Sequence, residues 1–243
     1  DQNDDAEPVE ALAARFDGWG NLTKVQEFDI DWGFFTDTAT KRLERIFSYD
    51  ALDRRTGETL GAAGSTLYVD LAGNVLEDRK WGQNTSQYVW SPATGELVLR
   101  DRDTDNNPGT GQATLPAGVD QRLYVIYDGQ GSVSAITDHA GSVVERYFYS
   151  PEGQLLITAP NGAARAASQY QWRYLFRGGR QDGQNLYRIG GQEWDWRQGG
   201  PLEHDPEAYW NDHLAIKPPS LSTYDRVVIF AVPSLIALAN TLG

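Results

Sequence analysis

The chain has 243 residues, of which 40% are hydrophobic and 12% aromatic, enough to fill the core of a large domain. Lys and Arg number 21 against 34 Asp and Glu, so the formal net charge is −13, which argues against nucleic acid and anionic membranes as partners. The absence of Cys excludes disulfides, thiol nucleophiles and cysteine metal sites. Because the chain also contains no Met, we interpret it as a processed product or as part of a longer parent chain.

A short phrase recurs between residues 16 and 160, after an acidic, Ala-rich lead-in at 1–15 that we expect to enter a β-sheet at Phe16. The phrase consists of a strand end, Asp or a stand-in, two residues, Gly, a small polar residue and a second strand. Its clear copies are FDGWGN at 16–21, VDLAGN at 69–74, YDGQGS at 127–132, TDHAGS at 137–142 and YSPEGQ at 149–154. Weaker copies are YDALDR at 49–54, where Asp53 replaces the Gly, and the longer WSPATGE at 90–96.

Each phrase predicts a tight turn between two strands. An Asp at the first turn position can accept backbone N–H groups, and a Gly three residues later can take the left-handed conformation. The stretch SVVERYFYS at 142–150 alternates in polarity as a half-buried strand does, and TKRLER at 40–45 is expected to continue a strand. The pattern therefore predicts an all-β fold, with at least half of residues 16–160 in strands of a long sheet that winds on itself.

Residues 101–120 predict a polar, Gly- and Pro-rich loop inside this sheet. Asp101, Asp103 and Asp105 alternate as the first ligands of a calcium loop do, and Asn107 follows them. An EF-hand is not expected, because Gln112 stands where a bidentate carboxylate is needed. Two interpretations stay open: a site at which these four residues bind Ca²⁺, and a solvated acidic loop.

The run RLYVIYDGQGSVSAITDHAGSVVERYFYSPEGQLL at 122–156 resembles the YD-repeat, or Rhs-repeat, family, which includes bacterial polymorphic toxins, C subunits of insecticidal toxin complexes, and teneurins. The segment 174–206 is similar to the Rhs-associated core that follows such repeats. The matching positions are Leu186, Tyr187, Asp195, Gly199, Asp205 and Pro206. The resemblance implies a bacterial secreted or cell-surface protein with a spiralling antiparallel β-sheet, or β-shell, and a core-like plug at 161–216.

Some family members cut themselves near this core with a pair of Asp and an Arg, and Asp195 and Asp205 fall on the Asp positions. Here the expected Gly-Leu cut site is absent, because Pro206 is followed by Glu207 and Ala208. Gln192 also stands near where the resemblance places the Arg. We therefore expect no autoproteolysis and no enzyme activity, with both Asp side chains capping turns.

The segment 217–243 predicts an apolar tail behind the helix-breaking Pro218 and Pro219. It is short for a membrane span and is interrupted by Pro233, so we do not expect a membrane as a partner. Burial inside the shell and insertion into a neighbouring copy stay open. The residues that we expect to mediate assembly are Val227, Val228, Ile229, Phe230, Leu235, Ile236 and Leu238.

Three functions remain in view from the sequence. The first is a non-enzymatic structural protein, the C-terminal part of an extracellular Rhs-like β-shell. The second is a self-assembling extracellular filament or tube subunit, in which open sheet edges pair from copy to copy. The third is an aspartyl autoprotease core. The partners expected are other copies of the chain or the rest of its parent chain.

Overall fold

A computed structural model of the chain describes residues 9–17, 20–32, 37–80, 85–105, 107, 109–183, 186–202 and 225–229. Across these residues strands dominate, and the one helical element is the 3₁₀ turn η1 (Phe176–Gly178). The chain divides into two compact units, one formed by Asp1–Ser65 with Asp205–Gly243, and the other by Thr66–His204.

Unit 1 is an antiparallel sheet with the strand order β4-β3-β2-β1-β18. Its strands are β1 (Val9–Phe16), β2 (Leu22–Trp32), β3 (Asp37–Tyr49), β4 (Arg55–Leu60) and β18 (Asp225–Ile229). The stretch TKRLER lies within β3, as its pattern predicts. The expected entry into the sheet at Phe16 is wrong, because β1 already begins at Val9. Leu12 and Ala14 of β1 are buried, so the second half of the lead-in belongs to the sheet.

Unit 2 contains a longer sheet in which each strand lies beside the strand that precedes it in the chain. Its strands are β5 (Ala63–Val69), β6 (Val75–Lys80), β7 (Thr85–Trp90), β8 (Leu97–Arg102), β9 (Gln121–Tyr127), β10 (Val133–Thr137), β11 (Val143–Tyr149), β12 (Leu155–Thr158) and β13 (Ala164–Arg165). β5 begins just before the division between the units. The sheet also extends past the predicted boundary at residue 160, because β13 pairs with β12.

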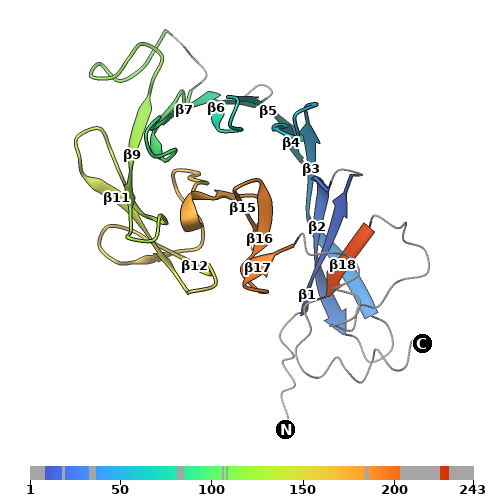
Figure 1. Cartoon of the computed structure of the whole chain (residues 1–243). Coiled ribbons are helices and arrows are strands. Elements are labelled where there is room, and N and C mark those ends of the chain that lie inside the picture. Colours follow the sequence, from blue (N-terminus) through green and yellow to red (C-terminus); the bar gives the residue numbers. More distant parts are fainter. Residues whose placement is uncertain are drawn as a thin grey trace. The chain divides into compact units, whose positions relative to one another are not determined.

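A second, smaller sheet follows β13 in unit 2. It comprises β14 (Arg180–Gln181), β15 (Leu186–Ile189), β16 (Gln192–Asp195) and β17 (Gly200–Pro201). We call residues 166–202, which include this sheet and η1, the plug. In Figure 1 the strands of the longer sheet curve around the plug, so one face of that sheet points inward toward β15 and β16.

The recurring phrases form the predicted turns. At the copy 69–74, the N–H of Gly73 donates to the carbonyl of Asp70 at 3.1 Å, and the Asp70 carboxylate accepts the N–H of Asn74 at 2.9 Å. Asp53 takes the place of Gly with a positive φ of 58° and donates its N–H to the carbonyl of Asp50. The all-β antiparallel prediction is confirmed, and more than half of the described residues between 16 and 160 lie in strands.

A further turn of the same kind escaped the sequence pattern. The N–H of Gly162 donates to the carbonyl of Ala159 at 2.9 Å, and Gly162 has a φ of 87°. Ala159 stands at the Asp position, and Asn161 supplies the side-chain acceptor for the N–H of Ala163 instead. The pair Asn161-Gly162 could have indicated this turn.

No described helix is long and apolar enough to cross a bilayer.

Candidate functional site

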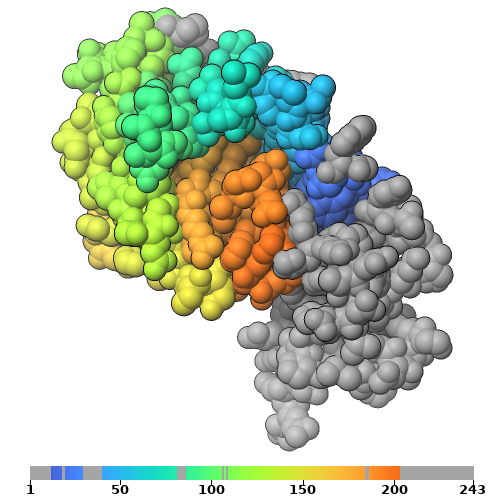
Figure 2. All heavy atoms as spheres, viewed as in Figure 1, coloured from blue at the N-terminus to red at the C-terminus, as the bar shows by residue number. Residues whose placement is uncertain are grey.

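The contact between the plug and the inner face of the longer sheet is a continuous apolar core within unit 2. Figure 2 shows plug residues, in orange, lying between the teal and yellow strands of that sheet. The ring of Tyr174 in the plug meets the rings of Tyr88 and Trp90 edge-on, with centroids 5.4 and 5.2 Å apart. The buried members of the core are Leu67, Val75, Tyr88, Leu97, Leu123, Val133, Ile136, Tyr147, Ile157, Trp172, Tyr174, Leu175, Phe176 and Tyr187. Plug and sheet therefore share one core and should fold together.

Aromatic side chains link successive hairpins along one edge of the sheets. In each case the donor is the Tyr hydroxyl or Trp N–H of the residue directly before the Asp or Ser of one phrase. The acceptor is the backbone carbonyl of the residue that directly follows the previous phrase at the same edge. The four bonds are Tyr49 to Leu22 at 2.7 Å, Trp90 to Val75 at 2.7 Å, Tyr127 to Leu97 at 2.9 Å and Tyr149 to Val133 at 2.8 Å. An aromatic residue with a donor at its tip can both fill the core and bind the next hairpin. This explains why Tyr or Trp so often precedes the turn.

Glu145 ties the end of the longer sheet to the beginning of the plug. Its carboxylate is fully buried on β11 and accepts hydrogen bonds from the hydroxyl of Tyr147 at 2.6 Å and from Arg165 at 2.7 Å. It also accepts from the hydroxyl of Ser168 and the N–H of Gln169. Burial, followed by the bond to Glu145, raises the pKa of Tyr147 above its ordinary value. The network fixes the path by which the chain leaves β13 and enters the plug.

Three further buried carboxylates of unit 2 pair with arginines. Asp78 on β6 meets Arg180 of the plug at 3.3 Å, although the two residues are 102 positions apart. The other pairs lie within the plug: Asp182 with Arg173 at 3.1 Å and Glu193 with Arg188 at 3.0 Å. A buried charge without such a partner costs several kcal/mol, on the order of 3–5, so each pair stabilises one arrangement of the plug against others.

Asp195, one of the two autoproteolysis candidates, is fully buried at the end of β16. Its carboxylate accepts the backbone N–H of Arg197 at 2.9 Å and pairs with the guanidinium of the same residue at 3.1 Å. The carbonyl of Asp195 also accepts the N–H of Gln198, so this Asp caps a turn as expected. The sequence reasoning searched for an Arg before Asp195 and missed Arg197 after it. Asp205 lies outside the described residues.

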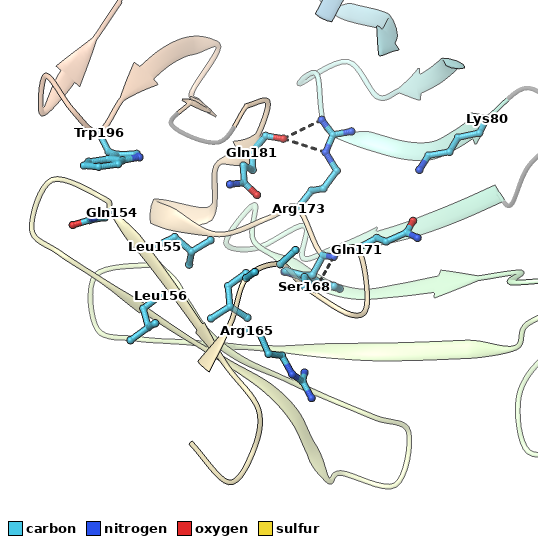
Figure 3. A pocket seen from close by; sticks show the side chains of 14 residues that line it. Lys80, Gln154, Leu155, Leu156, Arg165, Ser168, Gln171, Arg173, Gln181 and Trp196 are labelled. Atoms are coloured by element: carbon cyan, nitrogen blue, oxygen red, sulfur yellow. Dashed lines mark hydrogen bonds between the residues drawn. The ribbon is translucent and has the colours of Figure 1, made fainter. Parts of the chain in front are cut away.

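A cavity of about 480 Å³ lies beside the plug in unit 2. Figure 3 shows Trp196 and Gln154 on one side of it, Lys80 on the far side, and Leu155 pointing inward. The lining residues are Lys80, Gln154, Leu155, Leu156, Ile157, Arg165, Ala166, Ala167, Ser168, Gln171, Trp172, Arg173, Gln181 and Trp196. Among the described residues, the lining contains three basic side chains and no acidic one. Nothing in the sequence pattern indicated this site, because its residues come from five separate segments between Lys80 and Trp196.

The acidic loop after β8 brings together a different set of carboxylates from the predicted one. Asp103, Asp105 and Asp120 offer oxygens within 4.8 Å of one another. Asp101 does not join them, because it lies within β8 and pairs with Arg122 of β9, whose Nε donates to it at 2.7 Å. Asn107 accepts the N–H of Gly109 and donates its own N–H to Asp105.

The sequence pattern did not indicate Asp120 as a ligand, because this residue lies at the far end of the loop. Its carboxylate accepts the N–H and the hydroxyl of Thr104 at 2.7 and 2.9 Å, which draws the two ends of the loop together. A hydrogen bond from Thr110 lowers the pKa of Asp105, so this side chain is ionised at neutral pH. Oxygen ligands of this kind suit a hard cation such as Ca²⁺, and binding of Ca²⁺ here stays a prediction.

Three of the predicted assembly residues lie in β18, and the structure pairs this strand with β1 of the same chain. Val227, Val228 and Ile229 stand opposite Ala13, Leu12 and Ala11. Among the described residues this strand pairs within unit 1, and insertion of the segment into a neighbouring copy stays a prediction. The remaining assembly residues, Phe230, Leu235, Ile236 and Leu238, lie outside the described residues.

No protein-family model matches the chain, and no curated protein matches it. Among solved structures, a chain of the TcdB2-TccC3 crystal structure aligns with 80% of this chain at 15% identity and a TM-score of 0.49. A chain of the Photorhabdus luminescens Tc holotoxin pore aligns with 76% of it at 15% identity and a TM-score of 0.46. This chain spans 9% and 8% of those two chains. We take no function from likenesses of this size.

Proposed function

We propose that the chain is a non-enzymatic structural part of a secreted or cell-surface bacterial β-shell of the YD-repeat type, and that its plug closes the inner face of that shell. The observation that carries the proposal is the shared core of plug and sheet in unit 2. The turn phrases and the aromatic bonds between hairpins support it, because both build one continuous sheet rather than a substrate cleft.

The buried carboxylates of the plug support a structural role over a catalytic one. Asp182, Glu193 and Asp195 are fully buried and bind Arg173, Arg188 and Arg197, respectively. A general acid or base must reach the proton that it transfers. Carboxylates held in buried ion pairs within the plug are instead suited to fixing the fold of the plug itself.

Two experiments test this proposal. In the first, the purified chain is incubated for days at acid and neutral pH and its intact mass is followed. We expect one species of unchanged mass. Cleavage near residue 205 that disappears in the Asp195→Asn variant would instead establish the autoprotease.

The second experiment measures whether the plug braces the sheet. In Arg180→Gln, the buried carboxylate of Asp78 on β6 loses the cation that it meets in the plug. We expect faster amide hydrogen exchange across β6 and β7, measured by mass spectrometry. The matched control is Arg79→Gln, which removes an exposed arginine from β6, the strand that carries Asp78. Equal exchange in both variants would contradict a bracing role.

A second candidate function is a subunit of an extracellular filament or tube, joined by strand addition. The observation that favours it is the position of β18 at the end of the strand order in unit 1, where one edge of this strand has no neighbouring strand among the described residues. Such an edge is a template for pairing with another chain. The deletion experiment in the Discussion separates this candidate from the first.

A further inference from the structure

We propose that the cavity beside the plug of unit 2 binds a small organic anion that carries an aromatic ring. This inference goes beyond the structural role proposed above and does not depend on it. The volume of about 480 Å³ lies within the range of small-molecule sites, which is on the order of 300–1,000 Å³. Such sites combine an apolar wall with a few placed polar groups. The cavity contains both.

The charge around the cavity selects an anion. The basic lining residues are Lys80, Arg165 and Arg173, and no described lining residue is acidic, although the chain as a whole carries a net charge of −13. Arg165 and Arg173 are largely neutralised, because they pair with the buried carboxylates of Glu145 and Asp182. A net positive charge at the cavity therefore depends on residues other than Arg165 and Arg173.

Arg100 and Arg102 on β8 supply this charge directly behind the cavity wall. Among the described residues, neither has a carboxylate within ion-pair distance. Arg100 is 3% exposed and donates instead to the carbonyls of Tyr170 and Gln171 at 2.8 and 3.1 Å. Burial lowers the pKa of Arg100 below its ordinary value, yet a guanidinium remains charged at neutral pH. A buried cation without a counter-ion makes the potential of the adjacent space positive.

Gln171 connects these arginines to the cavity. Its side chain lines the cavity and accepts a hydrogen bond from Arg102 at 2.8 Å, while its backbone has a φ of 51°. A left-handed backbone is strained for Gln and persists only where its surroundings hold it. The two arginines hold this turn, so the polar wall of the cavity is formed before any ligand arrives.

The apolar part of the cavity wall is formed by Trp172, Trp196, Leu155 and Ile157. The guanidinium of Arg100 lies 5.1 Å from the ring centroid of Trp172, so a positive charge lies next to this buried ring. An aromatic anion can place its ring against Trp196, which is partly exposed, and its charged group toward the polar wall. A neutral ligand of the same shape would make the ring contact but would not gain from the positive charge.

Two probes of nearly equal shape test the proposal: indole-3-acetate, which is an anion, and indole-3-acetamide, which is neutral. Binding to the full chain is measured by isothermal titration calorimetry and ligand-observed NMR. We expect the anion to bind about tenfold more tightly, the effect of one charge-assisted hydrogen bond. Equal affinities, or no binding of the anion up to about 1 mM, overturn the proposal.

Three variants locate the site. Lys80→Gln removes a cation from the lining, and Arg102→Gln removes one from behind the wall. The matched control is Arg146→Gln, an exposed arginine on β11 that does not line the cavity. We expect the first two to weaken binding of indole-3-acetate about threefold to tenfold, and the control to leave it unchanged. Thermal unfolding verifies that each variant is folded, and an equal loss in the control would overturn the assignment.

Discussion

The hydroxyl of Tyr127 on β9 donates a hydrogen bond of 2.9 Å to the backbone carbonyl of Leu97, the first residue of β8. Leu97 directly follows one turn phrase, and Tyr127 directly precedes the Asp of the next phrase at the same edge of the sheet. The bond thus joins two hairpins whose turns are separated by more than thirty residues of chain. Burial also raises the pKa of Tyr127 to about 12, because the ionised phenolate would be poorly solvated there.

The first prediction concerns this bond. In Tyr127→Phe the ring remains but the carbonyl of Leu97 loses its donor, so we expect the free energy of unfolding to fall by about 0.5–1.5 kcal/mol. Urea unfolding followed by tryptophan fluorescence measures the change. The matched control is Tyr170→Phe, whose phenol makes no hydrogen bond among the described residues. An equal loss in both variants would show that the bond to Leu97 contributes nothing.

The second prediction concerns stability in acid. The hydrogen bond from Arg54 lowers the pKa of Asp50, with burial as a smaller opposing effect. A carboxyl whose folded pKa lies below its unfolded value stabilises the fold above the unfolded value of 3.8, and this contribution disappears as the pH falls through the folded pKa. We therefore expect stability to decrease below about pH 4.

The variant Asp50→Asn separates this contribution from the rest. An Asn can still accept the N–H groups of Leu52 and Arg54 in the same turn, but it does not titrate. Its unfolding should depend less on pH than that of the parent chain between about pH 2 and 5. Identical pH profiles for the two proteins would refute the role of Asp50.

Local turn chemistry made much of this fold predictable from the sequence. An Asp or Ser followed by a Gly three residues later acts within one turn, so copies such as 69–74 could be located without knowing any partner strand. Asp53 is the clearest case, because its positive φ follows from its position in the phrase.

The candidate sites depend on pairings that the sequence does not display. Asp101 was assigned to the acidic loop, but the register of β8 and β9 places it opposite Arg122. Asp120 joins the cluster only because the loop closes on itself. Arg180 finds Asp78 across 102 residues, and no local pattern contains such a contact.

The third prediction concerns the buried carboxylate of Glu145. In Glu145→Gln the cation of Arg165 loses its counter-ion in a largely buried position. We expect a loss of about 3 kcal/mol in the free energy of unfolding. The control Glu96→Gln removes an exposed carboxylate from a turn and should change stability by less than about 0.5 kcal/mol. If Glu145→Gln is no less stable than this control, the junction does not depend on the ion pair.

The fourth prediction concerns Ca²⁺ and the acidic loop. If the carboxylates of Asp103, Asp105 and Asp120 bind the ion together, calorimetric titration with Ca²⁺ should give a signal that Asp103→Asn and Asp120→Asn both weaken. Asp101→Asn is the discriminating control, because Asp101 is engaged by Arg122 and should leave the titration unchanged. Absence of any heat with the parent chain would make this a solvated acidic loop.

The last prediction concerns the strand β18, which covers the edge of β1 in unit 1. A chain lacking residues 225–243 would expose the N–H and C=O groups of β1 that β18 now pairs, and such an edge can pair with another copy. The control lacks only residues 230–243 and therefore keeps β18. We expect the longer deletion to increase self-association, measured by light scattering over a range of concentrations, while the control behaves as the parent chain does.

A filament subunit joined by strand exchange through β18 predicts the reverse: the parent chain and the control would assemble, and the longer deletion would not. Unchanged size and stability in all three proteins would mean that pairing of β18 with β1 contributes nothing.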